Sequence, residues 1–150
     1  MKQYIGTKMV QAEPVLKVQG EMYGIGEIAL RHDEDATYGY RVVYPDGYVS
    51  WSPKEVFEGA YRETTGMPFG LAIEAAKKGK KIARAGWNGK SQYVELAYCI
   101  SYKNHAAEVV NANHCNIGNK ALAFVGTSGV QLGWLASQAD MLADDWYIVE

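Results

Sequence analysis

FGLAIEAAKKGKKIARAGWNGK, residues 69–90, decides the fold of the second half of the chain. Four apolar residues recur at the i, i+3, i+4 and i+7 spacing of an amphipathic helix: Phe69, Ala72, Ile73 and Ala76. Gly79 ends this predicted helix of residues 69–78, and lysines occupy its last turn. A predicted strand over residues 81–86 then leads to Trp87. The apolar face of such a helix must be buried against another element, and we expect that element to be a sheet.

The rest of this half supplies the other strands of that sheet. Apolar patterning predicts strands over residues 93–97, 121–125, 130–134 and 147–149, the last at an edge. Gly126-Thr127-Ser128-Gly129 connects two of them. The fold class expected is therefore α+β, an antiparallel sheet with a packed helix. The polar, asparagine-rich residues 100–120 are expected to form a loop or arm with a helical or strand-like turn, next to a site or a subunit contact.

The first half is predicted to be a small, separate β-hairpin-plus-helix unit, with a boundary that divides the chain into residues 1–65 and 66–150. Strands over residues 40–44 and 48–51 flank the turn residues 45–47. Ser52 and Glu55 have the spacing of a capping box, which predicts a helix through Ala60. Residues 4–8 and 12–17 have strand character, and residues 21–35 are expected to be loop.

Composition limits the possible partners. The 15 basic and 17 acidic residues give a net charge of −2, which provides no overall attraction to DNA, RNA or a membrane surface. Two cysteines are too few for a disulfide framework, and no apolar run is long enough for a signal peptide or a membrane span. We therefore expect a cytoplasmic protein.

Trp87 and Asn88 are the sharpest candidate for ligand binding. An indole just past a strand end offers a stacking face, while the amide of Asn88 offers a donor and an acceptor to a purine or ribose edge. The alternative is a hairpin turn with a core tryptophan. Arg84 is the preferred phosphate contact among the nearby basic residues, although such charges usually form a solvated face.

The segment WLASQADMLADDW, residues 134–146, places a helix start between Trp134 and Trp146. Ser137 fits the N-cap position and Asp140 the N3 position, so a capping role explains both residues. The same helix start, with Gln138, is also suited to hydrogen bonding a phosphate or hydroxyl group. The sequence leaves both interpretations open.

Other chemistry has little support. No local Ser-His-Asp, Cys-His or paired-carboxylate set indicates catalysis. Four possible zinc ligands have no recognised spacing: Cys99, His105, His114 and Cys115. Residues 126–129 lack the lysine and the helix of a phosphate-binding loop. We expect neither a metal nor a cofactor.

Residues 67–150 resemble the Thoeris anti-defence protein two family of phages and prophages. The resemblance lies in the helix of residues 69–78, the Trp87-bearing strand and the terminal 134–146 motif, in that order. It implies a homo-oligomeric α+β protein that sequesters cyclic ADP-ribose isomers, and in some members cyclic oligonucleotides, without degrading them. By position, it also implies that Phe69 and Trp87 contact the ring of the ligand and that Asn88, Ser137, Gln138 and Asp140 supply polar contacts. Arg84 and Trp134, indicated by the residues themselves, complete the predicted ligand-binding set.

The leading hypothesis from the sequence is thus a non-enzymatic sponge for a cyclic nucleotide signal. One alternative is a phage enzyme that hydrolyses such a signal. Another is a structural or protein-binding accessory protein, in which the aromatic residues serve subunit and partner contacts.

Overall fold

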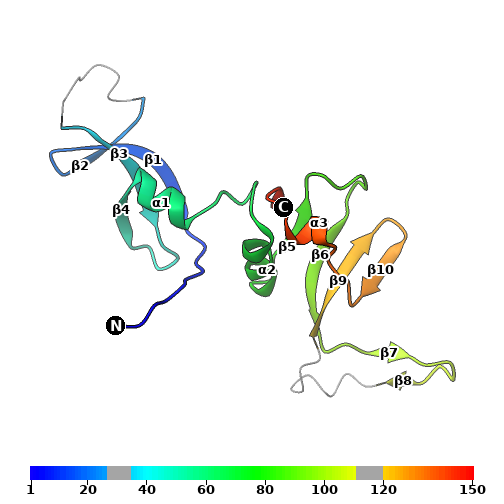
Figure 1. Ribbon diagram of the computed structural model, residues 1–150. Helices are drawn as coiled ribbons and strands as arrows, with labels where there is room; N and C mark the ends of the chain where they lie inside the picture. Colours follow the sequence, from blue (N-terminus) through cyan, green and yellow to red (C-terminus); the bar gives the residue numbers. More distant parts are fainter. Residues whose placement is uncertain (27–34, 111–119) are drawn as a thin grey trace. The chain divides into compact units, whose positions relative to one another are not determined.

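The computed structural model describes residues 1–26, 35–110 and 120–150. The chain divides into two compact units, Met1–Arg62 and Glu63–Glu150 (Figure 1). Each unit is built on its own antiparallel sheet. The structure confirms the predicted α+β class with its antiparallel sheet and packed helix.

The first unit is a four-stranded sheet with one short helix. Its strands have the order β2-β1-β3-β4, and α1 follows β4 directly. The bounds are β1 (Gln11–Val18), β2 (Glu21–Gly24), β3 (Thr37–Val43), β4 (Val49–Pro53) and α1 (Lys54–Ala60). The predicted hairpin is β3 and β4, which pair with Val43 opposite Val49. The helix ends at Ala60, as the sequence predicted.

Three predictions for this unit were wrong in detail. Residues 4–8 form no strand, and residues 21–24 are strand β2 rather than loop. Most of the remaining predicted loop, residues 27–34, lies outside the described residues. The capping box at Ser52 is absent, because Ser52 pairs with Tyr40 in the sheet and Pro53 takes the N-cap position without a side-chain hydrogen bond.

The second unit is a five-stranded sheet with the order β10-β9-β6-β5-β11, in which every neighbouring pair is antiparallel. Its strands are β5 (Lys81–Arg84), β6 (Tyr93–Tyr98), β9 (Lys120–Gly126), β10 (Gly129–Leu132) and β11 (Trp146–Val149). Its helices are α2 (Phe69–Lys77) and α3 (Gln138–Met141). A separate hairpin of β7 (Tyr102–Lys103) and β8 (Val109–Val110) lies within residues 100–120, the predicted loop or arm. Residues 111–119 of that segment are outside the described part.

Small residues let α2 approach the sheet closely. Ala72, Ala75 and Ala76 are buried on the helix, and they join Ile82 and Trp146 in one core cluster. The pairing of Ile82 with Val94 and Ile148 places these side chains on the same face of the sheet, because side chains alternate along a strand. This helix-covered face is also the one that carries Trp146, which is 0% exposed.

The chain segment before α2 covers the outer edge of β11. Main-chain hydrogen bonds join Met67 and Trp146 in both directions, at 2.7 and 3.1 Å, and Ile148 N donates to Thr64 O at 2.9 Å. Strand β11 is an edge strand of the sheet, as predicted, but its outer hydrogen-bonding groups are partly satisfied. No helix in the described residues has the length and apolar character needed to cross a membrane.

Gly39 of β3 lies under the indole of Trp51 in the first unit. A Cβ atom at position 39 would come within 2.7 Å of two indole atoms and would overlap the main-chain oxygen of Ser52. Because a backbone oxygen cannot rotate away as a side chain can, glycine is required here by the close approach.

We predict that Gly39→Ala lowers the free energy of unfolding of the first unit by about 1–3 kcal/mol through overpacking. Hydrogen exchange of strands β1–β4 in the full chain measures this effect. Gly59→Ala is the matched control, since a Cβ atom there meets nothing within 4 Å. Equal exchange protection in the two variants would contradict the prediction.

Candidate functional site

Trp87 lies in a turn just beyond β5, partly buried among other rings. Its ring centroid is 5.3 Å from that of Trp146, 5.6 Å from Phe124 and 6.0 Å from Trp134. All three neighbours meet it at steep interplanar angles of 65–77°. Edge-to-face packing of this kind fixes the orientation of the indole as well as its depth.

Helix α3 begins with the capping box that the sequence predicted. Ser137 Oγ accepts a hydrogen bond from Asp140 N at 3.1 Å, and Ser137 N donates to Asp140 Oδ2 at 3.0 Å. The hydroxyl of Ser137 also donates to Asp140 Oδ2 at 2.7 Å. Asp140 is therefore locked onto the start of its own helix.

The other carboxylate oxygen of Asp140 faces the turn after β5. Asp140 Oδ1 accepts from Arg84 Nη1 at 2.9 Å and from Trp87 Nε1 at 3.1 Å. Its main-chain oxygen accepts from Trp146 Nε1 at 2.9 Å. One residue thus joins α3, the end of β5 and two of the clustered tryptophans.

A second carboxylate completes the ion-pair network. Asp145 Oδ1 accepts from Arg84 Nε at 2.8 Å, while Asp145 Oδ2 accepts from Gly86 N at 2.8 Å. The side chain of Arg84 is 18% exposed and lies between the two acids. Such charge-assisted hydrogen bonds are stronger than neutral ones.

The network shifts the ionisation of all three groups. Burial disfavours the charged form of Asp140, but hydrogen bonds from Arg84, Ser137 and Trp87 outweigh it and lower its pKa to about 2. The hydrogen bond from Arg84 lowers the pKa of Asp145. Hydrogen bonds to Asp145 and Asp140 raise the pKa of Arg84. The site therefore holds one cation and two carboxylates in their charged forms at neutral pH.

The fold brings most of the sequence-predicted site residues together. Asp140 accepts hydrogen bonds from Arg84, Trp87 and Ser137. Trp134 packs on Trp87. Phe69 is partly buried against the same core cluster and packs on Trp146 with a centroid separation of 5.4 Å. Two further predicted residues are exposed. Asn88 follows Trp87 in the chain, and Gln138 is the first residue of α3.

Sequence reasoning missed Phe124 and Asp145. Phe124 is one residue of a predicted strand, and only the pairing of β6 with β9 shows that it lies on the helix-covered face opposite Val94. Asp145 gave no signal in the sequence, because its partner Arg84 is brought close only by the β5–β11 register, in which Trp146 pairs with Arg84.

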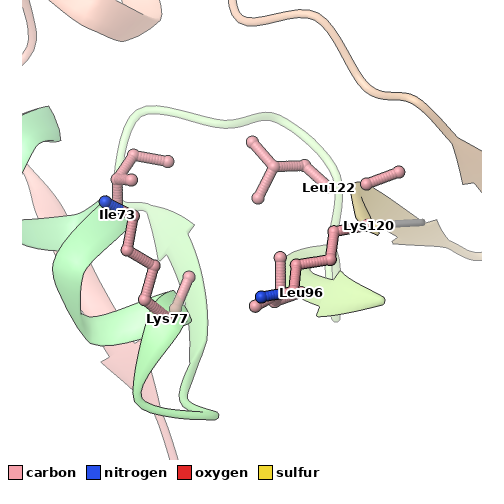
Figure 2. A pocket seen from close by; sticks show the side chains of 7 residues that line it. Ile73, Lys77, Leu96, Lys120 and Leu122 are labelled. Carbon is pink, nitrogen blue, oxygen red and sulfur yellow. The ribbon is translucent and has the colours of Figure 1, made fainter. Parts of the chain in front are cut away.

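A hollow lies between α2 and the sheet, and no predicted site residue lines it. Figure 2 shows Ile73 and Lys77 opposite Leu96, Lys120 and Leu122. The hollow between them has a volume of about 290 Å³. Its lining is apolar apart from the two lysines. Within the described ranges no group of three or more potential ligands is placed to hold a metal ion; His114 and Cys115 of the zinc hypothesis lie outside those ranges.

Fold and site together define a class of protein: a small α+β domain whose antiparallel sheet carries a helix on one face and an ion-paired aromatic cluster beside it. Residues 67–149 match the Thoeris anti-defense 2-like domain, and the chain belongs to that family. Thoeris anti-defense 2 of Bacillus phage SP01 is 36% identical over 90 residues, which cover 57% of this chain and 97% of the relative.

Acid is expected to weaken the fold through Asp140. In the unfolded chain Asp140 takes up a proton near its ordinary pKa of 3.8, whereas in the folded chain its pKa is about 2. The stability contributed by this ionised group is therefore fully present above about pH 4 and is lost as the pH falls towards about 2.

Urea unfolding at a series of pH values measures this contribution, with Asp140→Asn as the reference variant. We predict that the difference in free energy of unfolding between the two proteins shrinks across that window. A difference that stays constant with pH would show that the Asp140 carboxylate is not held by the network described.

Proposed function

We propose that this protein binds a cyclic ADP-ribose isomer and holds it without altering it, so that a bacterial Thoeris defence is deprived of its signal. Membership of the Thoeris anti-defense 2-like family supports the link to that defence. The single observation that carries the ligand proposal is the position of Trp87, partly exposed and hydrogen bonded through Nε1 to an ionised carboxylate. The proposed setting is the cytoplasm of a phage-infected or lysogenic host.

The arrangement suits a flat ring with polar edges. A base that stacks on an aromatic side chain gains about 1–3 kcal/mol. The exposed amides of Asn88 and Gln138 provide donors and acceptors for its edge or for ribose hydroxyls. Because Trp87 is already oriented by three rings and Asp140, little ordering free energy is lost when a ligand binds.

Arg84 has a supporting part in this proposal. Its Nε and Nη1 atoms already donate to Asp145 and Asp140, so it contributes by holding those carboxylates in place. The positive charge of Arg84 offsets only one of the two negative charges of Asp140 and Asp145. Phosphates of the ligand are therefore best accommodated away from the two acids, on the side of Trp87 where Asn88 and Lys90 are exposed.

Sequestration fits the ionisation of the site better than hydrolysis does. A general acid or base works best with a pKa near the operating pH, and Asp140 has a pKa of about 2. The hydrogen bond from Arg84 likewise lowers the pKa of Asp145, which moves it further from neutral pH. These carboxylates are suited to hold their neighbours rather than to transfer protons.

The proposal includes association with further copies of the chain. The second unit leaves large apolar side chains in water: Leu135 is 89% exposed, Leu142 78% and Val130 64%. Leu135 and Leu142 flank α3, beside the site, and Val130 lies on the open edge strand β10. A contiguous apolar surface is typical of a protein contact, and we propose that these side chains contribute to one.

Trp87→Phe and Asn88→Ala test the ligand site by isothermal calorimetry with a cyclic ADP-ribose isomer. We expect each to weaken binding by about tenfold or more, since each removes part of a stacking surface or one polar contact. Trp51→Phe, in the first unit, is the control and should bind as the wild type does. Wild-type affinity in both site variants would remove Trp87 and Asn88 from the ligand site.

Recovery of the ligand separates a sponge from the enzyme alternative. Protein is incubated with the cyclic ADP-ribose isomer and denatured, and the supernatant is chromatographed. We expect all of the ligand to return intact, whatever the amount of protein added. A linear product that accumulates beyond one equivalent would favour hydrolysis.

Sedimentation velocity tests the association. We predict a particle larger than one chain, which Leu142→Glu shifts towards the monomer because a buried charge at an apolar contact is costly. A wild-type monomer at all concentrations would contradict the proposed association.

A further inference from the structure

We infer that Asp145 is a positioning residue for Trp87, and this inference rests on the proposed function. Asp145 does not contact the indole in the described structure, and no sequence pattern pointed to it. Two routes nevertheless connect its side chain to Trp87: a hydrogen bond to the main chain at Gly86, the residue before Trp87, and a series of hydrogen bonds through Arg84 and Asp140.

The first route passes through the backbone. Asp145 Oδ2 accepts from Gly86 N at 2.8 Å, and Asp145 O accepts from Ala85 N at 3.1 Å. These two bonds fasten the residues immediately before Trp87 to the start of β11. The packing is close, since a Cβ atom on Gly86 would lie only 2.9 Å from Asp145 Oδ2.

The second route passes through side chains. Asp145 Oδ1 accepts from Arg84 Nε, which fixes the guanidinium plane. Arg84 Nη1 then donates to Asp140 Oδ1, the oxygen that also accepts from Trp87 Nε1. Asp145 therefore holds Arg84 against Asp140, the residue that accepts from the indole N–H.

Asparagine is the informative replacement because it changes the hydrogen-bonding capacity of Asp145 and keeps its size. A carboxylate accepts on both oxygens, whereas an amide has one acceptor and one donor. Asp145→Asn can therefore satisfy Arg84 Nε or Gly86 N but not both. One of the two routes to Trp87 must break.

Two readouts on Asp145→Asn test the inference. NMR measures solvent exchange of the Trp87 indole N–H, assigned with Trp87→Phe, and calorimetry measures affinity for the cyclic ADP-ribose isomer. We expect the exchange rate to rise, and affinity to fall, each by about tenfold, as expected when a hydrogen bond to a charged group is lost. The Trp146 indole N–H, bonded to the main-chain oxygen of Asp140, should exchange at its wild-type rate.

Glu74→Gln is the matched control, because it removes an ion pair of similar length, Lys77 Nζ to Glu74 Oε1 at 2.9 Å, on the exposed side of α2. It should change neither readout. An unchanged Trp87 exchange rate in Asp145→Asn would overturn the inference, and so would faster exchange without any loss of affinity. Wild-type protein that binds no cyclic ADP-ribose isomer would instead contradict the proposed function, while the exchange measurement still reports on the positioning of Trp87.

Discussion

The carboxylate of Asp140 is the contact on which the rest of the second unit's site depends. It caps α3 through Ser137, receives the indole N–H of Trp87 and pairs with Arg84. The main-chain oxygen of the same residue holds Trp146, the largest fully buried side chain. A polar group in such a position stabilises the fold only when every acceptor is used, and the Asp140 carboxylate meets that condition.

A structural and a functional Trp87 are compatible in this arrangement. The indole packs against the core cluster, where it meets three rings, and it is only partly buried. Under the proposed function, the contacts that stabilise the domain are the same ones that orient a stacking surface before any ligand arrives. The proposal therefore ties stability and ligand affinity to one network.

Local sequence patterns predicted the elements well where one face of a helix or strand decides the structure, as in α2, β9 and β11, and where capping chemistry stands alone, as at Ser137 and Asp140. They were wrong at Ser52, because pairing with Tyr40 in the sheet outcompetes a local cap. They could not find Asp145, whose partner Arg84 is 61 residues away in sequence and is brought close only by the β5–β11 register. The candidate site was thus predictable in its tryptophans and capping residues, but Phe124 and the ion-pair network are brought to it only by tertiary contacts.

The most direct test of this account is a crystal structure of the protein with a bound cyclic ADP-ribose isomer. The account predicts ligand density against the Trp87 indole, with the Arg84–Asp140 and Arg84–Asp145 ion pairs unbroken and the clustered tryptophans unmoved. Density in the apolar hollow between α2 and the sheet, or an Asp140 side chain turned away from Trp87 to reach the ligand, would contradict it.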